Sequence, residues 1–240
     1  TGVAFTENIK SLEKVKINMR VLHNVKNPDT SVEMFGKKMK APIFAAPVSG
    51  TTLNMGGKYT EKEYISWVIE GCLKAGIYPM VGDTAIETFL TDNLEVLKEK
   101  NADGIAFIKP WENDAIISKM KLAEDAGVFA LGVDVDACGL VTLSLHGKNV
   151  EPKTLDKIKE LKKATKLPFI LKGLMTVDEA ILAAEAGVDA IVVSNHGGRV
   201  LDCTPGAADV LPAIAKAVKG KTIILADGGV RTGVDVLKLI

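Results

Sequence analysis

A histidine and an arginine directly follow the apolar run DAIVV, in the segment SNHGGRVLD from Ser194 to Asp202. The imidazole of His196 can act as a general base near neutral pH, because its reference pKa is about 6.5. Arg199 presents a planar fork of N–H donors that matches a carboxylate. Gly197 and Gly198 stand between the two and let the backbone turn sharply. The segment therefore predicts a site where a base and a carboxylate clamp act on one small molecule.

Charged residues also end several other apolar runs. Lys172 ends PFILK, where an ammonium group is costly to bury unless it is paired or functional, so we expect a functional role for it. Asp136 follows FALGVDV, and a carboxylate arriving from another strand can orient His196 and stabilise its imidazolium form. Lys109 follows GIAFI and is either a second cation of the same site or a solvated loop lysine.

The segment DGGVRTG, from Asp227 to Gly233, joins a strand-like run to the start of a helix. Glycines at such a junction expose backbone N–H groups, and with the positive end of the helix these can cradle a phosphate. A tight turn that needs only glycine is the alternative. Arg231 favours the phosphate interpretation, because it adds a cation at the same junction.

Short apolar runs recur along the chain and are the strands that must position these residues. They show no alternation, which indicates strands buried on both faces, and they begin at Pro42, Gly76, Gly104, Phe129, Pro168, Asp189 and Thr222. Segments with helical spacing separate them, and several end in glycine, as a helix C-terminus favours. The pattern predicts an α/β fold, a (β/α)8 TIM barrel, in which the carboxyl ends of the strands form one mouth.

The repeat accounts for seven strands, so we expect the sequence to lack the last strand of the barrel and its N-terminal segment. An eighth strand would follow the helix that begins near Thr232. We expect residues 1–240 to form a single domain, with residues 1–40 leading into the barrel. A doubly wound sheet is the alternative, and it is disfavoured because no G-x-G-x-x-G motif opens the first helix.

Composition narrows the class of partner. The chain is 47% hydrophobic and 25% charged, with 30 basic and 30 acidic residues, so we expect no nucleic-acid partner. No apolar run reaches the roughly 18 to 20 residues that cross a bilayer, so we expect no membrane partner. Cys72, Cys138 and Cys203 are widely spaced, which argues against a disulfide framework or a metal site and fits a reducing cytoplasm.

These motifs together resemble the FMN-dependent 2-hydroxy acid dehydrogenase and oxidase family, which includes glycolate oxidase and lactate oxidase. The resemblance is strongest in LKGLMTVDEAILAAEAGVDAIVVSNHGGRVLD followed by DGGVRTGVDVLK, and it extends more weakly back through APIFAAPVSG to VLHNV. It implies an FMN-binding barrel, FMN as the cofactor, a small 2-hydroxy acid as the substrate, and a homo-oligomer.

The resemblance also implies a role for each residue of the site. His196 would take a proton from the substrate, Arg199 would bind its carboxylate, and Asp136 would orient His196. Lys172 would lie at the N1/O2 edge of the flavin, where a cation stabilises the reduced anionic ring. The remaining cofactor-binding residues would hold the ring, ribityl chain and phosphate: Pro47, Val48, Ser49, Ser194, Asp227, Gly228, Gly229 and Arg231.

The chain departs from the family pattern at two places. Typical members have a second arginine after the fourth strand and a tyrosine after the third, but no arginine lies between Arg20 and Arg199. The third strand is followed instead by Lys109 and Trp111, and Lys109 is the residue that could replace part of the lost substrate binding. Which 2-hydroxy acid is used, and which electron acceptor, stay open.

Two other functions are compatible with such a barrel. One is a different FMN chemistry, such as isomerisation of an isoprenoid diphosphate, but a substrate without a carboxylate leaves Arg199 unexplained. The other is a non-catalytic module that binds flavin or a metabolite, but a binding module has no need of the base His196. Oxidation of a 2-hydroxy acid is therefore the favoured function.

Overall fold

The computed structural model describes residues 2–240. Its main sheet has seven parallel strands in the order β3-β4-β5-β6-β7-β8-β9, so each strand is hydrogen-bonded to the next one along the chain. The strands are β3 (Phe44–Ala45), β4 (Tyr78–Gly82), β5 (Ile105–Ile108), β6 (Ala130–Asp134), β7 (Phe169–Leu174), β8 (Ala190–Val193) and β9 (Ile223–Ala226). All seven predicted strands are confirmed, and the doubly wound alternative is wrong because the strand order never reverses.

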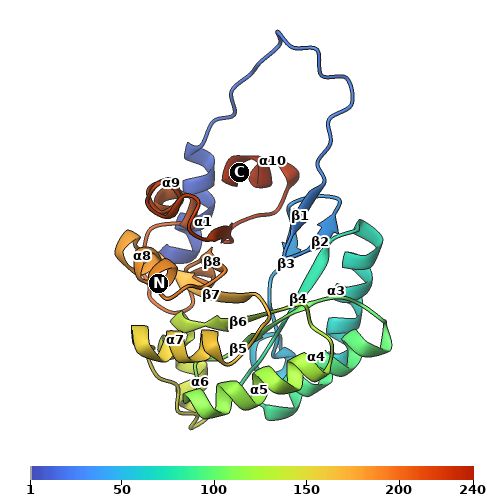
Figure 1. Cartoon of the computed structure of the whole chain (residues 1–240), viewed down its shortest axis with the longest axis vertical. Coiled ribbons are helices and arrows are strands. Elements are labelled where there is room, and N and C mark those ends of the chain that lie inside the picture. Colours follow the sequence, from blue (N-terminus) through green and yellow to red (C-terminus); the bar gives the residue numbers. More distant parts are fainter. Residues whose placement is uncertain (1) are drawn as a thin grey trace.

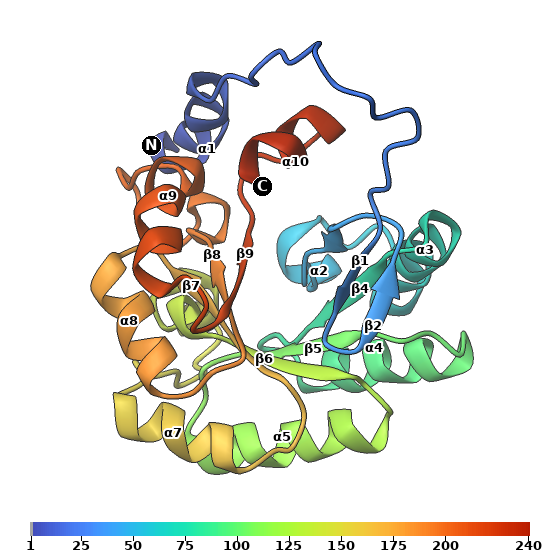
Figure 2. The same ribbon diagram turned by 45° about the horizontal axis from the view of Figure 1, so that its top comes forward.

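Helices cover the outer side of the curled sheet (Figure 2). They are α3 (Glu61–Ala75), α4 (Glu87–Glu99), α5 (Asn113–Asp125), α7 (Leu155–Lys163), α8 (Val177–Glu185) and α9 (Ala207–Val218). Capping residues determine where these helices begin and end, as α3 shows. Thr60 and Glu63 form a reciprocal capping box at the start of α3, and Gly76 ends that helix in the left-handed conformation with φ +71°.

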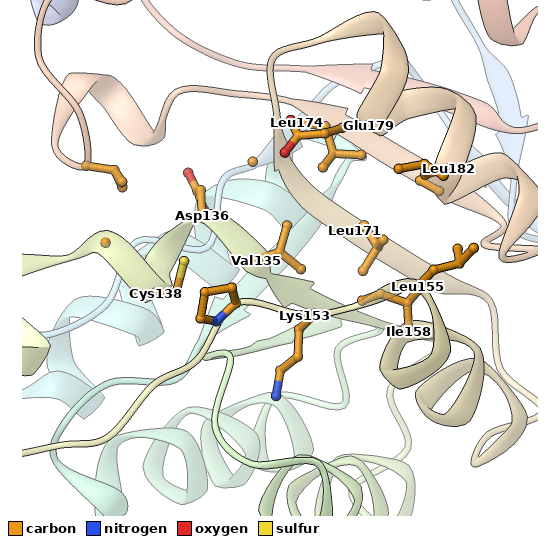
Figure 3. A pocket seen from close by; sticks show the side chains of 15 residues that line it. Val135, Asp136, Cys138, Lys153, Leu155, Ile158, Leu171, Leu174, Glu179 and Leu182 are labelled. Carbon is orange, nitrogen blue, oxygen red and sulfur yellow. The ribbon is translucent and has the colours of Figure 1, made fainter.

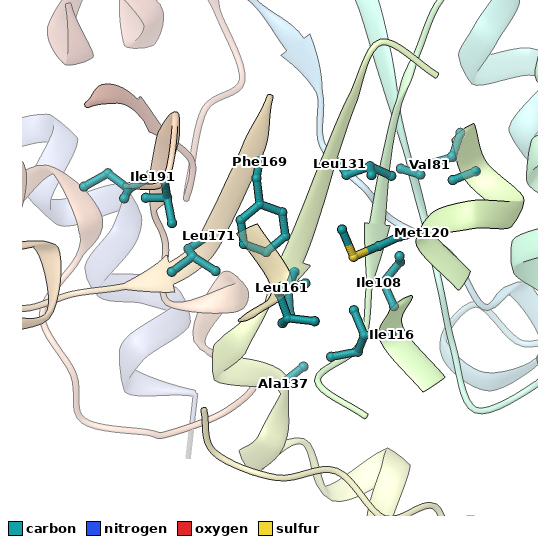
Figure 4. Packing of buried hydrophobic residues seen from close by; sticks show 14 of the residues in the cluster. Val81, Ile108, Ile116, Met120, Leu131, Ala137, Leu161, Phe169, Leu171 and Ile191 are labelled. Carbon is teal, nitrogen blue, oxygen red and sulfur yellow. The ribbon is translucent and has the colours of Figure 1, made fainter. Parts of the chain in front are cut away.

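Two groups of buried side chains explain why the strands are apolar throughout. One group lies between the sheet and the helices and includes Ile108, Leu131 and Phe169 (Figure 4). The other fills the interior of the curled sheet and includes Phe107 and Ile170. Neighbouring residues on a strand point to opposite faces, so both faces of β4 to β8 are buried, whereas the outermost strands β3 and β9 are only partly covered.

Several elements before and between the βα units were not predicted. Helix α1 (Val3–Lys14) lies beside α9 (Figure 1), and a hairpin of β1 (Val32–Met34) and β2 (Lys37–Met39) precedes the main sheet. Short helical turns follow three strands: α2 (Thr51–Asn54), the 3₁₀ turn η1 (Val135–Gly139) with α6 (Val141–Leu145), and the 3₁₀ turn η2 (His196–Gly198).

The curled sheet stays open between its first and last strands. Within residues 2–240, β3 and β9 form no ladder with each other, and helix α10 (Gly233–Leu239) lies beside the gap (Figure 2). A cavity of about 680 Å³, the gap cavity, is lined by residues of β3, β9 and α10. No helix among these residues has the length and apolar content to cross a bilayer.

Candidate active site

A second cavity, of about 340 Å³, lies at the carboxyl ends of the strands and is named the central cavity. The parallel sheet brings the ends of all seven strands to one side, which is where barrels build their sites. Most of the predicted site residues line this cavity: Pro47, Val48, Ser49, Lys109, Lys172, His196, Arg199, Asp227, Gly228 and Gly229.

His196 and Asp136 are in direct contact. Nδ1 of His196 lies 3.1 Å from both Oδ1 and Oδ2 of Asp136. The short turn η2 holds the histidine in the left-handed region, with φ +56°, and the Asn195 side chain accepts from the N–H of Gly198. Gly173, with φ +107°, makes room for Asp136, because a side chain at this glycine would overlap the carboxylate.

The environment of His196 suits a base. Burial and the nearby Lys172 ammonium lower the pKa of His196 below its ordinary value, although the Asp136 carboxylate opposes them. The imidazole is therefore neutral at pH 7. Since Asp136 holds Nδ1, that nitrogen carries the proton and Nε2 keeps a free lone pair that can accept a proton.

Four charged side chains from the ends of β5, β6, β7 and β9 lie close together. Oδ2 of Asp134 lies 2.5 Å from Nζ of Lys109, and Oδ1 of Asp134 lies 3.8 Å from Nζ of Lys172. Nζ of Lys172 also lies 3.8 Å from Oδ2 of Asp227. Lys109 is buried, so it is not the solvated loop lysine that the sequence left open.

These contacts fix the charges of the group. Burial raises the pKa of the Asp134 carboxyl, but Lys109 and Lys172 lower it by more, and the net result is well below its ordinary value. Burial lowers the pKa of Lys172, but Asp134 and Asp227 outweigh that effect and raise it. Asp134 is therefore a carboxylate and Lys172 an ammonium group at neutral pH.

Arg199 lies at the exposed mouth of the central cavity. Its Nη2 donates to Oδ1 of Asn54, 2.7 Å away, and Asn54 in turn donates from Nδ2 to the backbone oxygen of Ser49. Nothing in the sequence singled out Asn54, because its helix α2 is a single turn without periodicity. The guanidinium reaches the cavity with further N–H donors for an anion.

The loop from Ser49 to Thr51 is fixed from outside the barrel. Glu61, at the start of α3, accepts from the Ser49 hydroxyl and from the N–H groups of Gly50 and Thr51. The Ser49 hydroxyl is thus committed to Glu61. Ser194 lies behind the wall of the cavity, where it is fully buried and accepts from the N–H of His196.

The predicted phosphate loop has a second neighbour that the sequence did not reveal. Side chains at Gly228 or Gly229 would overlap Asn8 of helix α1, so these glycines also permit a close helix contact. The carboxylate of Asp235 accepts from the N–H groups of Arg231 and Thr232, which takes up two donors of the predicted cradle. The Arg231 side chain is exposed and does not line the central cavity or the gap cavity.

Trp111 has a packing role. Its Nε1 donates to Oδ2 of the buried Asp83 at 2.5 Å, and Lys119 pairs with Oδ1 of the same carboxylate at 2.9 Å.

Leu140 and Leu143 also line the central cavity, from the segment after β6, although no motif in the sequence marks them. Two apolar residues three positions apart are too common in any chain to distinguish a cavity wall from the core.

A third cavity, of about 390 Å³, lies on the outer side of Asp136 (Figure 3). Leu171, Leu182 and Ile158 form its apolar wall, and Glu179 lies at its edge. Asp136 therefore separates this outer cavity from His196. Among residues 2–240, no group of His, Cys, Asp and Glu side chains gathers that could hold a metal ion.

The residues present fit a flavin nucleotide. The central cavity and the gap cavity adjoin, because Ala46, Pro47, Lys172, Asp227, Gly228 and Gly229 line both. Their volumes lie in or near the range of about 300 to 1,000 Å³ that is typical of cofactor sites. Oδ1 of Asp227 is buried without a hydrogen-bond partner in the described chain, as suits a carboxylate that accepts from ligand hydroxyls.

An open barrel that brings a histidine, an arginine and a buried lysine to one cavity at the strand ends fits a flavin-dependent oxidoreductase. Comparison with known proteins makes this specific. The sequence profile of the FMN-dependent dehydrogenase family matches residues 1–143 and 141–240. The chain therefore belongs to the FMN-dependent dehydrogenase family, and the predicted family, cofactor and enzyme class are confirmed.

Individual relatives are named as 2-hydroxy acid oxidases. A peroxisomal (S)-2-hydroxyacid oxidase of Arabidopsis thaliana is 32% identical over 98% of this chain and 71% of its own length. An L-lactate oxidase of Lacticaseibacillus rhamnosus is 29% identical over 100% of this chain and 71% of its own.

Solved structures agree with the barrel. Mandelate oxidase with 3,3-difluoro-2-hydroxy-3-phenylpropionic acid superposes with a TM-score of 0.81 at 27% identity, covering 100% of this chain and 73% of its own. A mandelate oxidase mutant with a monooxide FMN adduct gives a TM-score of 0.77 at 28% identity, covering 100% of this chain and 74% of its own.

Proposed function

We propose that this protein oxidises a 2-hydroxy acid to the 2-oxo acid with FMN as its cofactor. The observation that carries the proposal is the contact of His196 with Asp136 beside a cavity that also holds Arg199 and Lys172. The reaction removes two electrons and two protons from the carbinol group of the substrate. Bound FMN supplies the two-electron acceptor.

His196 is proposed to be the catalytic base. Its Nε2 accepts a proton from the substrate, while Asp136 holds Nδ1–H and stabilises the imidazolium form that results. The two contacts at 3.1 Å fix the ring.

Arg199 and Lys109 are proposed to bind the substrate. The guanidinium of Arg199 can hold the carboxylate in a bidentate pair, because Asn54 engages only its Nη2. Lys109 lines the opposite part of the cavity and adds a single point charge, which orients an oxygen less strictly than a second arginine would. Leu140 and Leu143 add an apolar wall for the substrate side chain.

Several residues are proposed to hold FMN. Lys172 supplies a buried positive charge at the ring, and Pro47, Val48 and Ser49 line it. Asp227 accepts from ribityl hydroxyls. Gly228, Gly229 and Arg231 bind the phosphate, for which Arg231 must turn from its present exposed position, and Ser194 supports the site through the N–H of His196.

The oligomeric state and the cellular location are predicted from the sequence and from its resemblance to the family. A homo-oligomer is proposed on the family resemblance alone. Cytoplasmic localisation stays a prediction, and one relative is a peroxisomal enzyme. The printed activities of the relatives favour 2-hydroxy acid oxidation over the isomerase and over the non-catalytic module.

The test is a pair of variants at the base. The FMN-loaded protein is supplied with a panel of 2-hydroxy acids and an artificial electron acceptor, and the 2-oxo acid product is measured. His196→Gln should lower kcat by about 10²- to 10⁴-fold while FMN stays bound. An unchanged kcat in this variant would exclude His196 as the base, and a wild-type protein that forms no 2-oxo acid would exclude the function.

A further inference from the structure

Two carboxylates, two positions apart at the end of β6, have different partners. Asp136 contacts His196, whereas Asp134 lies between two lysines. Asp134 is only 2% exposed, and its Cα is in register with that of Lys172 on the neighbouring strand β7. Lys109 reaches it from the end of β5, on the other side.

We infer that Asp134 is a positioning residue that holds Lys109 in place by direct contact, keeps Lys172 in the ammonium form and leaves Asp136 to serve His196. The inference rests on the proposed function only for the roles of Lys109, Lys172 and His196 in the reaction. Asp134 itself does not line the central cavity, so it acts through the two lysines that do.

The charge balance supports this assignment. The formal charges of Lys109 and Lys172 are balanced by those of Asp134 and Asp227, whereas a net charge of +1 would remain in this buried group without Asp134. Oδ1 of Asp134 is buried and has no hydrogen-bond partner in the described chain, so its surroundings offer it only the charge of Lys172.

The neighbouring charges cannot replace Asp134. The other charged or titratable groups that act on Lys172 and His196 come from η1, η2 and the end of β9, and they are Asp136, Arg199 and Asp227. Asp227 is already 3.8 Å from Lys172. Without Asp134, the carboxylates left to attract Lys172 are Asp227 and then Asp136, and Asp136 is the partner of His196.

The test is a cycle of Asp134→Asn, Lys109→Met and the double variant. Asp134→Asn makes the charge of the group more positive by one, Lys109→Met makes it more negative by one, and the double variant returns to the wild-type charge. The protein is labelled with ¹³C at the lysine ε-carbons, and NMR follows each ammonium group against pH. Loss of a signal in Lys109→Met and in Lys172→Met assigns the two buried lysines.

In Asp134→Asn, Lys172 should lose its proton at a pH at least about one unit lower, a tenfold weaker proton affinity. In the double variant Lys172 should titrate as in the wild type. Asp103→Asn is the matched control, because it removes the partner of Lys37 at 2.8 Å where both side chains are partly exposed, and it should leave the titration of Lys172 unchanged.

A second readout follows Asp136. The pH profile of kcat/KM should change in Asp134→Asn and return towards the wild-type shape in the double variant. Wild-type titration of Lys172 in Asp134→Asn, or a double variant in which Lys172 titrates as in Asp134→Asn alone, would overturn the inference. Because the lysine titration needs no turnover, it decides the matter even if the protein oxidises none of the acids tried.

Discussion

Replacing Gly173 with alanine should damage the site through Asp136 alone. This glycine lies where the register between β7 and β8 shifts, with φ +107°, and a side chain there would overlap Asp136 Cβ, Cγ and Oδ1. The backbone conformation costs an alanine on the order of 1–3 kcal/mol of unfolding free energy. The overlap forces the carboxylate away from His196, and a displacement of about 1 Å can lower a rate by about 10²-fold.

Gly187 provides the matched control. It also has a positive φ, of +79°, but a side chain there would meet nothing within 4 Å. Gly187→Ala should therefore lose a similar free energy of unfolding in urea and keep its kcat/KM. Gly173→Ala should lose both, with kcat/KM about 10²-fold lower, which corresponds to about 2.7 kcal/mol of transition-state stabilisation.

The kcat/KM values of the two variants show whether Asp136 must keep its present position. Equal kcat/KM for Gly173→Ala and Gly187→Ala, at a temperature where both are folded, would show that Asp136 does not need its present position. A Gly173→Ala variant that binds FMN normally and still loses rate would locate the defect in the His196–Asp136 contact.

Three other perturbations have definite expected outcomes. Arg199→Lys should raise KM for the acid more than it lowers kcat, because a point charge replaces a bidentate fork, and a kcat loss with unchanged KM would contradict this. On acidification, kcat/KM should fall only below about pH 6.5, since the folded-state pKa of His196 is lowered; for the same reason this group removes stability as pH falls below about 6.5, which urea unfolding at several pH values checks. Glu61→Gln should lower the free energy of unfolding by about 1–3 kcal/mol, because the Ser49 hydroxyl and the loop N–H groups donate to two different carboxylate oxygens and the amide nitrogen that replaces one of them cannot accept; unchanged stability would show that this network is not needed.

The strands and the residues of the central cavity could be predicted because short stretches of sequence determine them. Continuous apolar runs can only be strands or helices buried on both sides, and the regular alternation with helical segments left the barrel as the favoured arrangement. Polar residues at the ends of such strands must then converge. This is why Lys172 and His196 could be placed at one cavity before any geometry was known.

Features that depend on contacts between distant segments could not be predicted from the sequence. Asn8 lies 187 residues from Asn195, to which it donates at 2.8 Å, and no local pattern marks either of them as partners. The division of tasks between Asp134 and Asp136 depends on which way each side chain points after β6 ends.

The central claim is tested most directly by the visible absorption spectrum of the FMN-loaded protein. The spectrum is recorded under anaerobic conditions before and after addition of lactate, glycolate or a longer 2-hydroxy acid. Bleaching of the flavin band by at least one of these acids, with one equivalent of 2-oxo acid formed per flavin, is the expected result. A bound flavin that none of them reduces would contradict the proposed oxidation of a 2-hydroxy acid.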